Sequence, residues 1–118
     1  IWTRIRGRKV FSDNLKDRAN MDDKELVEFA SDFRESILNG RSSDLMCAAV
    51  CWPMETLLNL YGVECRSITT HEAVTRNGPS NHVWIKLADG RALDPTADQF
   101  GDEYPPVYLG PALAFHQG

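Results

Sequence analysis

The sequence predicts an α+β fold in which a central helix packs on a small antiparallel sheet. Two observations lead to this prediction: hydrophobic residues recur at helical spacing in the first half of the chain, and apolar and polar residues alternate in the second half. The 118 residues suffice for one hydrophobic core but not for two, so we expect a single domain over residues 1–118. The first residue is Ile1 rather than Met, which suggests a domain excised from a longer chain.

Two helices are predicted after an N-terminal arm. Residues 1–20 are mostly polar, and we expect an extended arm or short strand followed by a loop. A helix is predicted over 23–39, where apolar residues recur at helical spacing and Asn39-Gly40 supplies a stop. A second helix is predicted over 45–61. Its apolar residues cover most of its circumference, so it should be the buried central helix.

The start and the middle of the second helix carry two further signals. Ser43 is the expected N-cap residue. Pro53 lies inside the predicted range, where a proline removes a backbone donor at a cost of about 3 kcal/mol. The helix should therefore bend at Pro53 or be irregular in the turns before it.

The second half of the chain predicts the sheet, because its apolar and polar residues alternate in short runs that contain β-branched side chains. The expected strands, with the last one only a candidate, are 63–70, 82–88, 91–94 and 107–109. Asp89-Gly90 predicts a two-residue hairpin turn between the second and third strands. Residues 72–80 contain Asn77-Gly78-Pro79, so we expect a loop there.

Charge and hydropathy exclude some classes of partner. The net charge is −4, and basic residues cluster only near the N-terminus, at Arg4, Arg6, Arg8 and Lys9. Nucleic acid binding needs a concentrated basic face, so we expect no nucleic acid partner. The chain has no apolar run long enough to cross a bilayer and no signal peptide at its start, so we expect no membrane association. The sequence does not indicate an oligomeric state.

The three cysteines, Cys47, Cys51 and Cys65, are too few and too closely grouped for a secreted disulfide framework. We therefore expect a reducing compartment such as the cytoplasm. A zinc site made by Cys47 and Cys51 with His71 or His82 is disfavoured, because the four-residue spacing is unusual and a second ligand pair is missing. We expect neither a metal nor another cofactor.

The predicted hairpin brings a histidine and an acid together. His82 opens its first strand and Asp94 closes its second, so antiparallel pairing can place the imidazole within reach of the carboxylate. This is the base and orienting acid of a catalytic triad, and it requires a nucleophile. The alternative is a surface histidine and a turn aspartate that never meet.

Cys47 is the expected nucleophile. If Ser43 caps the second helix, Cys47 lies in its first turn, where unsatisfied N–H groups lower a thiol pKa and can stabilise an oxyanion. Cys51 lies one turn further along and is expected to pack behind it. Cys65 is expected in the middle of a strand, with its side chain in the hydrophobic core. If the helix begins instead at Pro53, a favoured first residue, Cys51 becomes the nucleophile.

These residues together resemble the papain-like and transglutaminase-like superfamily of thiol enzymes. The resemblance covers about residues 43–100 and rests on four stretches, Cys47-Ala48-Ala49-Val50-Cys51, Leu57-Leu58 with Gly62-Val63, His82-Val83-Trp84, and Leu93-Asp94-Pro95-Thr96. In these families the histidine begins a strand as His-x-Trp and the acid follows on the next strand. The resemblance implies a Cys47-His82-Asp94 triad and a protein or peptide substrate.

The sequence departs from the superfamily in two places. Pro53 falls where those enzymes have an uninterrupted helix. Papain-like peptidases also place a glutamine before the cysteine as an oxyanion donor, and residues 39–46 contain none. Asn39, a backbone N–H or Gln99 could replace it. Gln99 could instead hold His82 or the turn, or its amide could satisfy the backbone of the 95–101 loop.

The expected activity is therefore acyl transfer at amide bonds, as a cysteine peptidase, protein-glutamine deamidase or transglutaminase. The alternative is a non-catalytic interaction domain that keeps the fold. Asp98 would replace Asp94 as the orienting acid if Asp94 proved dispensable, and is otherwise expected to cap a turn. If the domain belongs to an effector protein, it would be delivered into a host cell.

Overall fold

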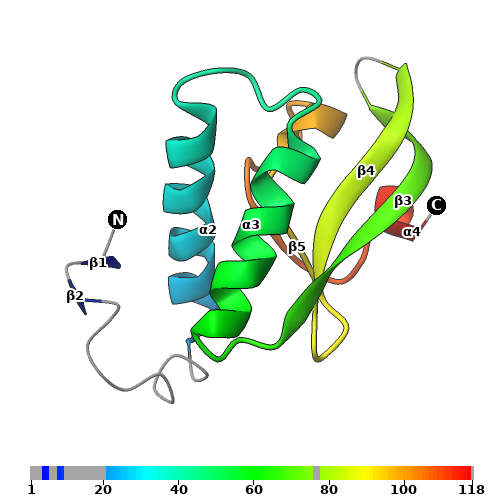
Figure 1. Cartoon of the computed structure of the whole chain (residues 1–118). Helices are drawn as coiled ribbons and strands as arrows, with labels where there is room; N and C mark the ends of the chain where they lie inside the picture. Colours follow the sequence, from blue (N-terminus) through cyan, green and yellow to red (C-terminus); the bar gives the residue numbers. More distant parts are fainter. Residues whose placement is uncertain (1–3, 6–7, 10–20, 76–77, 118) are drawn as a thin grey trace.

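A computed structural model of the chain describes residues 4–5, 8–9, 21–75 and 78–117. Its main sheet has four antiparallel strands in the order β3-β4-β5-β6. The helix α3 (Cys47–Leu60) packs against β4 and β3, and α2 (Asp23–Leu38) packs beside α3 (Figure 1). The architecture is thus α+β with α3 as the central helix, as the sequence predicts.

The first helix, α2, has the boundaries that its sequence predicts to within one residue. Asp22 and Glu25 form a capping box: the Glu25 N–H donates to Asp22 Oδ1 at 2.8 Å, and the Asp22 N–H donates to Glu25 Oε1 at 3.3 Å. Asn39 ends the helix in a left-handed conformation with φ 51°.

The central helix α3 begins two residues later than predicted, and Ser43 is not its cap. Met46 occupies the N-cap position, while the Ser43 hydroxyl donates to Asp98 Oδ1 at 2.7 Å. The Ser43 hydroxyl therefore binds a carboxylate that is distant in the sequence and does not bind the backbone at the helix start. The residue before Met46, Leu45, is left-handed with φ 63°, an uncommon conformation for leucine.

Pro53 lies within α3, and the helix continues through it to Leu60. The proline leaves the carbonyl of Ala49 without its usual helical donor. Ala49 and Pro53 are both exposed, so water can reach this carbonyl and the break costs less than it would in the core.

The predicted loop at 72–80 is wrong, because β3 (Cys65–Thr75) and β4 (Gly78–Leu87) extend through most of it as a paired arm. The register shifts between Thr70 and Ala73, and Glu72 in that interval has φ 58°. Residues 71–72 of β3 therefore lie opposite the single residue Asn81 of β4 in a β-bulge, and strand pairing resumes at Ala73. The Gly-Pro signal lies at the start of β4, where Gly78 pairs with Thr75 and Pro79 with Val74. Residues 76–77 of the predicted loop lie outside the described residues.

The hairpin between β4 and β5 (Ala92–Asp94) is close to its prediction but has a longer turn. The Leu87 N–H donates to the Arg91 carbonyl at 2.9 Å, so three residues form the turn rather than two. The last of them, Gly90, has φ 93°, which glycine adopts without strain. The last strand, β6 (Tyr108–Gly110), pairs with β5 one residue later than the candidate 107–109.

The β4–β5 register positions the candidate site. Ile85 pairs with Leu93, which places Asp94 opposite Trp84 and diagonally beside His82. His82 therefore lies in the middle of β4 and does not open the strand, contrary to the prediction. The two side chains are still brought together, because the diagonal positions of an antiparallel pair lie on one face of the sheet.

The hydrophobic core lies between the helices and the sheet. From β4 it contains Val83, Ile85 and Leu87, whereas His82 and Trp84, which alternate with them, contact the C-terminal segment instead. Cys65, predicted mid-strand, begins β3 and is buried in this core. From the two helices the core includes Leu26, Phe29, Ala30, Phe33, Leu38, Cys47, Val50, Cys51, Met54 and Leu58.

At the N-terminus, β1 (Arg4–Ile5) pairs with β2 (Arg8–Lys9) in a two-stranded antiparallel sheet. The rest of the prediction for residues 1–20 lies outside the described residues. Among the described helices, none is long and apolar enough to cross a membrane.

Arg34 on α2 fixes the loop that follows β5. Its buried guanidinium donates to the Pro95 carbonyl at 2.8 Å and the Pro106 carbonyl at 3.2 Å, and binds both Asp98 oxygens at 2.9 and 3.1 Å. A short 3-10 helix, η1 (Ala97–Phe100), lies between these anchor points and carries Gln99. One cation therefore sets the path of the chain beyond Asp94.

We predict that Arg34→Met lowers the free energy of unfolding by about 3 kcal/mol, because it removes the cation from a partly buried carboxylate and the guanidinium donor from two carbonyls. Urea denaturation measures this change. The matched control is Arg66→Met at an exposed position of β3, which should change stability by less than about 0.5 kcal/mol. Equal effects of the two substitutions would contradict the anchoring role.

Candidate active site

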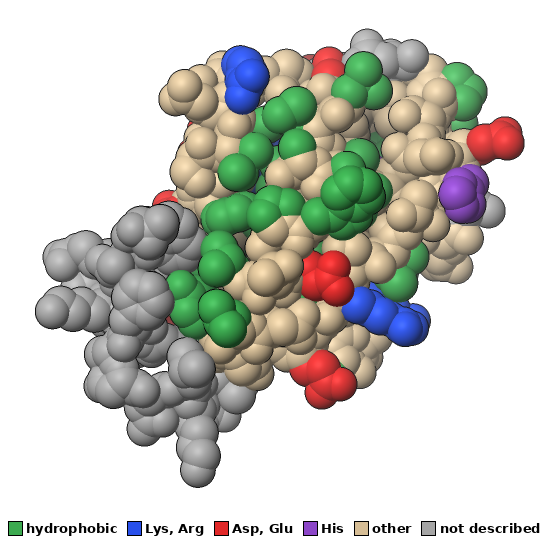
Figure 2. Space-filling view, in the orientation of Figure 1, with side chains coloured by type: hydrophobic (Ala, Val, Ile, Leu, Met, Phe, Trp, Pro, Cys, Tyr) green, Lys and Arg blue, Asp and Glu red, His purple; other side chains and the backbone are tan. Residues whose placement is uncertain are grey.

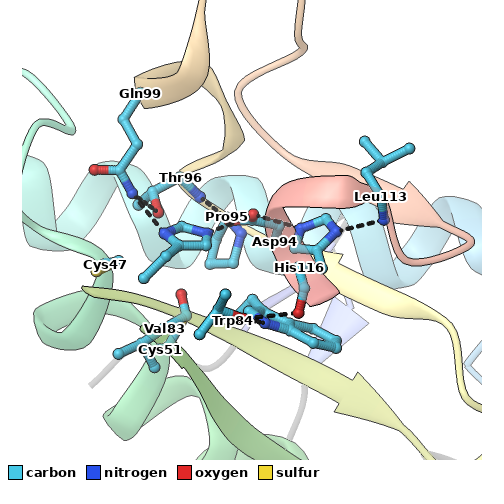
Figure 3. Close-up of polar contacts among 12 residues, drawn as sticks. Cys47, Cys51, Val83, Trp84, Asp94, Pro95, Thr96, Gln99, Leu113 and His116 are labelled. Carbon is cyan, nitrogen blue, oxygen red and sulfur yellow. Dashed lines mark hydrogen bonds and ion pairs between the residues drawn. The ribbon is translucent and has the colours of Figure 1, made fainter. Parts of the chain in front are cut away.

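Asp94 and His82 form a buried hydrogen-bonded pair. His82 Nε2 lies 2.7 Å from Asp94 Oδ2, and both side chains are fully buried. The backbone N–H of Thr96 donates to the other carboxylate oxygen at 3.1 Å. The carboxylate therefore receives donors on both oxygens, and His82 is oriented with Nε2 toward it. Figure 3 shows Asp94 between Thr96 and His116.

Cys47 lies at the N-terminal end of α3 and faces the His82 ring. The first hydrogen bond within the helix runs from the Val50 N–H to the Met46 carbonyl, so the N–H groups of Cys47, Ala48 and Ala49 point out of the helix end. Burial by itself raises the pKa of the Cys47 thiol. The hydrogen bond with His82, the backbone groups of Val83 and Ala48, and the charge of His82 outweigh burial, and the thiol pKa is lowered.

The electrostatics of His82 complement those of the thiol. Burial lowers the pKa of the imidazole, but hydrogen bonds and charge interactions with Asp94 and Cys47 raise it to about 9. A lowered thiol pKa beside a raised imidazole pKa eases transfer of the thiol proton to the imidazole. The resulting thiolate–imidazolium pair forms above the lowered thiol pKa and is lost as the pH rises through about 9.

Gln99 contacts Nδ1 of His82, the ring nitrogen that is not bound to Asp94. Its Nε2 lies 2.8 Å from His82 Nδ1 and 3.2 Å from Thr96 Oγ1, and its Oε1 accepts from the Leu45 N–H at 3.4 Å. The last contact sets the amide orientation, so Nε2 is the donor toward the ring. Of the roles expected for Gln99, the structure places it on His82 rather than on the backbone of the 95–101 loop.

Aromatic rings enclose the imidazole. Phe100 meets His82 edge-on with ring centroids 4.6 Å apart, and Phe115 stacks on Phe100 at 3.9 Å. Cys47 itself is 7% exposed. The site is therefore largely closed to solvent, which strengthens its electrostatic interactions.

His116 is a member of the cluster that sequence reasoning missed. It lies in α4 (Ala114–Gln117), and its Nε2 is 2.8 Å from the same Asp94 Oδ2 that His82 contacts. No periodic pattern marks this short segment. The only signal in the sequence is a histidine that follows an apolar and an aromatic residue, Ala114 and Phe115, near the end of the 118 residues. This pattern is too common to identify His116 as a site residue.

Among residues 21–75 and 78–117, one group of three side chains could share a metal ion, namely His82, Asp94 and His116, whose ligand atoms lie within 4.8 Å of one another. The hydrogen bonds argue against this use. A neutral imidazole that binds a metal through Nε2 keeps its proton on Nδ1. The Nδ1 of His116 accepts the Leu113 N–H at 2.9 Å and that of His82 accepts from Gln99, which leaves no place for those protons.

The other candidates have different positions. Cys51 is fully buried in the second turn of α3, and its thiol donates to the Val83 carbonyl at 3.2 Å, so it does not occupy a helix N-terminus. Asp98 binds Arg34 and Ser43 and does not orient His82. His71 is exposed and lies 3.3 Å from the Asn81 side chain, away from both cysteines of the disfavoured zinc site.

No family model, curated protein or solved structure matches this chain.

We predict that iodoacetamide alkylates Cys47 at a lower pH than Cys65. The two thiols are similarly buried, with 7% and 9% exposure, so access of the reagent is comparable. Burial raises the pKa of Cys65 to about 12, whereas that of Cys47 is lowered from 9.0, and only the thiolate reacts. Mass spectrometry of peptides after timed labelling from pH 5 to 9 measures both rates. The same pH profile for the two thiols would contradict the site electrostatics.

Proposed function

We propose that this protein is a thiol-dependent acyl-transfer enzyme that acts on amide bonds through Cys47, His82 and Asp94. The observation that supports this proposal most strongly is the buried His82–Asp94 pair beside a thiol at the start of α3, with a lowered thiol pKa and a raised imidazole pKa. Opposed shifts of this kind are typical of groups that exchange a proton in a catalytic site.

In the first step, His82 Nδ1 takes the thiol proton of Cys47, and the thiolate attacks the amide carbonyl carbon. A carbon–sulfur bond forms as the carbonyl electron pair moves to oxygen. The outward N–H groups of the first turn of α3 are the donors for this oxyanion. Asp94 accepts from His82 Nε2 and stabilises the imidazolium.

In the second step, the oxyanion collapses, the carbon–nitrogen bond breaks, and the amine leaves with the proton from His82 Nδ1. The thioester on Cys47 is then attacked by water, whose proton His82 accepts and returns to the sulfur. With a backbone amide the products are those of a peptidase. With a glutamine side chain they are ammonia and glutamate, and a second amine in place of water gives transglutamination.

Gln99 has a specific part in this reaction. In the neutral site the Gln99 amide donates a hydrogen bond to His82 Nδ1. Once Nδ1 has taken the proton from Cys47, it is itself a donor and can no longer accept a hydrogen bond from the amide N–H. The amide must then release Nδ1, which frees its N–H group for another acceptor. It becomes available as an oxyanion donor when the oxyanion forms.

The arrangement of elements fits the papain-like and transglutaminase-like superfamily that the motifs resemble. A helix that starts with the cysteine packs on an antiparallel sheet, and the histidine and the acid lie on neighbouring strands. Membership of that superfamily is part of the proposal. The departures are His82 in the middle of its strand and Pro53 within the helix.

A non-catalytic interaction domain is the second candidate, and two observations favour it. Cys47 is nearly closed to solvent. The outer face of α3 is apolar, with Trp52 and Leu60 exposed by 58% and 57%, and hydrophobic side chains gather over this helix (Figure 2). The alkylation profile separates the candidates, because an interaction domain does not require an activated thiol.

Three assays test the proposed activity: cleavage of a fluorescently labelled unfolded protein, ammonia release from a glutamine peptide, and coupling of a fluorescent primary amine to that peptide. We predict that Cys47→Ala reduces the observed activity at least about 1,000-fold while the protein still folds and melts cooperatively. The control is Cys51→Ala, one turn along the same helix, which should keep most of the activity. Failure of all three assays, together with an unactivated Cys47, would refute the enzyme proposal.

We predict that Gln99→Ala and Gln99→Glu each lower turnover about 100-fold, because both remove the amide donor to the oxyanion. Glutamate keeps the size of the side chain, so its melting temperature should lie closer to that of the unaltered protein. Steady-state kinetics and thermal denaturation measure the two effects. Preserved turnover with a lower melting temperature would assign Gln99 to the scaffold.

A further inference from the structure

Both ring nitrogens of His116 are committed. The Leu113 N–H donates to Nδ1 at 2.9 Å, and Nε2 lies 2.8 Å from Asp94 Oδ2. An imidazole nitrogen that accepts an N–H carries no proton, so Nδ1 is bare. The ring proton of His116 is therefore on Nε2 and donates to Asp94.

The segment that carries His116 is anchored at several points. The Thr70 hydroxyl donates to the His116 carbonyl at 2.7 Å, and the Trp84 indole N–H donates to that hydroxyl at 2.9 Å. Phe115 stacks on Phe100, the ring that walls His82. The donor that Asp94 receives from His116 is thus held in place by β3, β4 and η1.

We propose that His116 is a positioning residue of this site: its Nε2–H holds the Asp94 carboxylate ionised and aimed at His82, which keeps the His82 proton on Nε2 and leaves Nδ1 toward Cys47. This inference rests on the proposed function. His116 touches neither the thiol nor the reacting atoms in this account, and it acts through Asp94.

The burial of Asp94 explains why a second donor is needed. Burial raises the pKa of this carboxyl, and the hydrogen bond from His116 is the largest of the influences that lower it, followed by the hydrogen bond and charge of His82. The net pKa of Asp94 is lowered. Without His116, the carboxyl would take up a proton at a higher pH and would no longer stabilise the His82 imidazolium.

Other ionisable side chains also lie near the cluster. Cys47 and Cys51 face it from α3, and Tyr108 on β6 stacks on His116 with ring centroids 5.8 Å apart. Desolvation raises the pKa of Cys51 well above 9.0, so this thiol stays neutral through the acid range. The facing side chains from β3 and η1, Thr70 and Gln99, do not titrate.

The experiment compares His116→Phe, which removes the donor, with His116→Gln, whose amide N–H can reach the position of Nε2. The readout is the rate of Cys47 alkylation by iodoacetamide as a function of pH. We expect the acid limb of this profile to move up by about one pH unit in His116→Phe, the size expected for loss of one hydrogen bond to a charged group. His116→Gln should restore the original limb. Gln117→Ala, an exposed change in the same helix, is the matched control.

An unchanged limb in His116→Phe, or a limb displaced equally in the phenylalanine and glutamine variants, would overturn the inference. So would a shift of the unaltered profile on addition of EDTA, because it would indicate a metal held by His82, Asp94 and His116 in place of the proton network. If His116→Phe does not fold, nitrogen-15 spectra of the unaltered protein decide: a bare Nδ1 and a protonated Nε2 are expected for His116, and a protonated Nδ1 contradicts the inference. Failure of the proposed function is distinguished by the unaltered protein, whose Cys47 would then show no activated thiol at any pH.

Discussion

The burial of one carboxylate is the constraint on which this structure depends. Asp94 is withdrawn from water, and an ionised carboxylate is tolerated there only when hydrogen bonds replace its hydration. Its donors come from three parts of the chain: His82 on β4, the Thr96 backbone just after β5, and His116 near the C-terminus. The sheet and the C-terminal segment must therefore be assembled together before the carboxylate is satisfied, which couples the geometry of the site to completion of the fold.

A second buried charge performs the corresponding task for the loop beyond β5. Arg34 binds the carbonyl of Pro95, the residue between Asp94 and Thr96, and also holds Asp98, the residue before Gln99. Residues 94–99 are thus fixed from α2 on one side and by the histidines on the other. This explains how Gln99 reaches the His82 ring although η1 is only one turn long. It also explains why Ser43 is drawn to Asp98 and does not cap α3.

The parts of the fold that could be predicted from sequence are those set by local chemistry. The capping box at Asp22, the stop at Asn39 and the period of the apolar residues define α2, and the Asp-Gly turn defines the β4–β5 hairpin. The pairing of His82 with Asp94 follows from that hairpin. The loop predicted at 72–80 failed because a bulge at Glu72 lets pairing resume, and local propensity does not encode such a register shift. His116 could not be predicted, since its partners lie 22 and 46 residues away in the sequence.

The hydrogen bonds of the site form one directed chain. The Leu113 N–H fixes the proton of His116 on Nε2, His116 and His82 both donate to Asp94, and Nδ1 of His82 is left as an acceptor. In the neutral site Gln99 occupies that acceptor, so the proposed proton transfer from Cys47 must displace it. Gln99 is tied at its other end to the N–H of Leu45, the residue with the left-handed backbone just before α3. The side chain that must move is therefore anchored to the segment that presents the thiol, so displacement of the amide and rearrangement of the turn before Cys47 are one event in the proposed reaction.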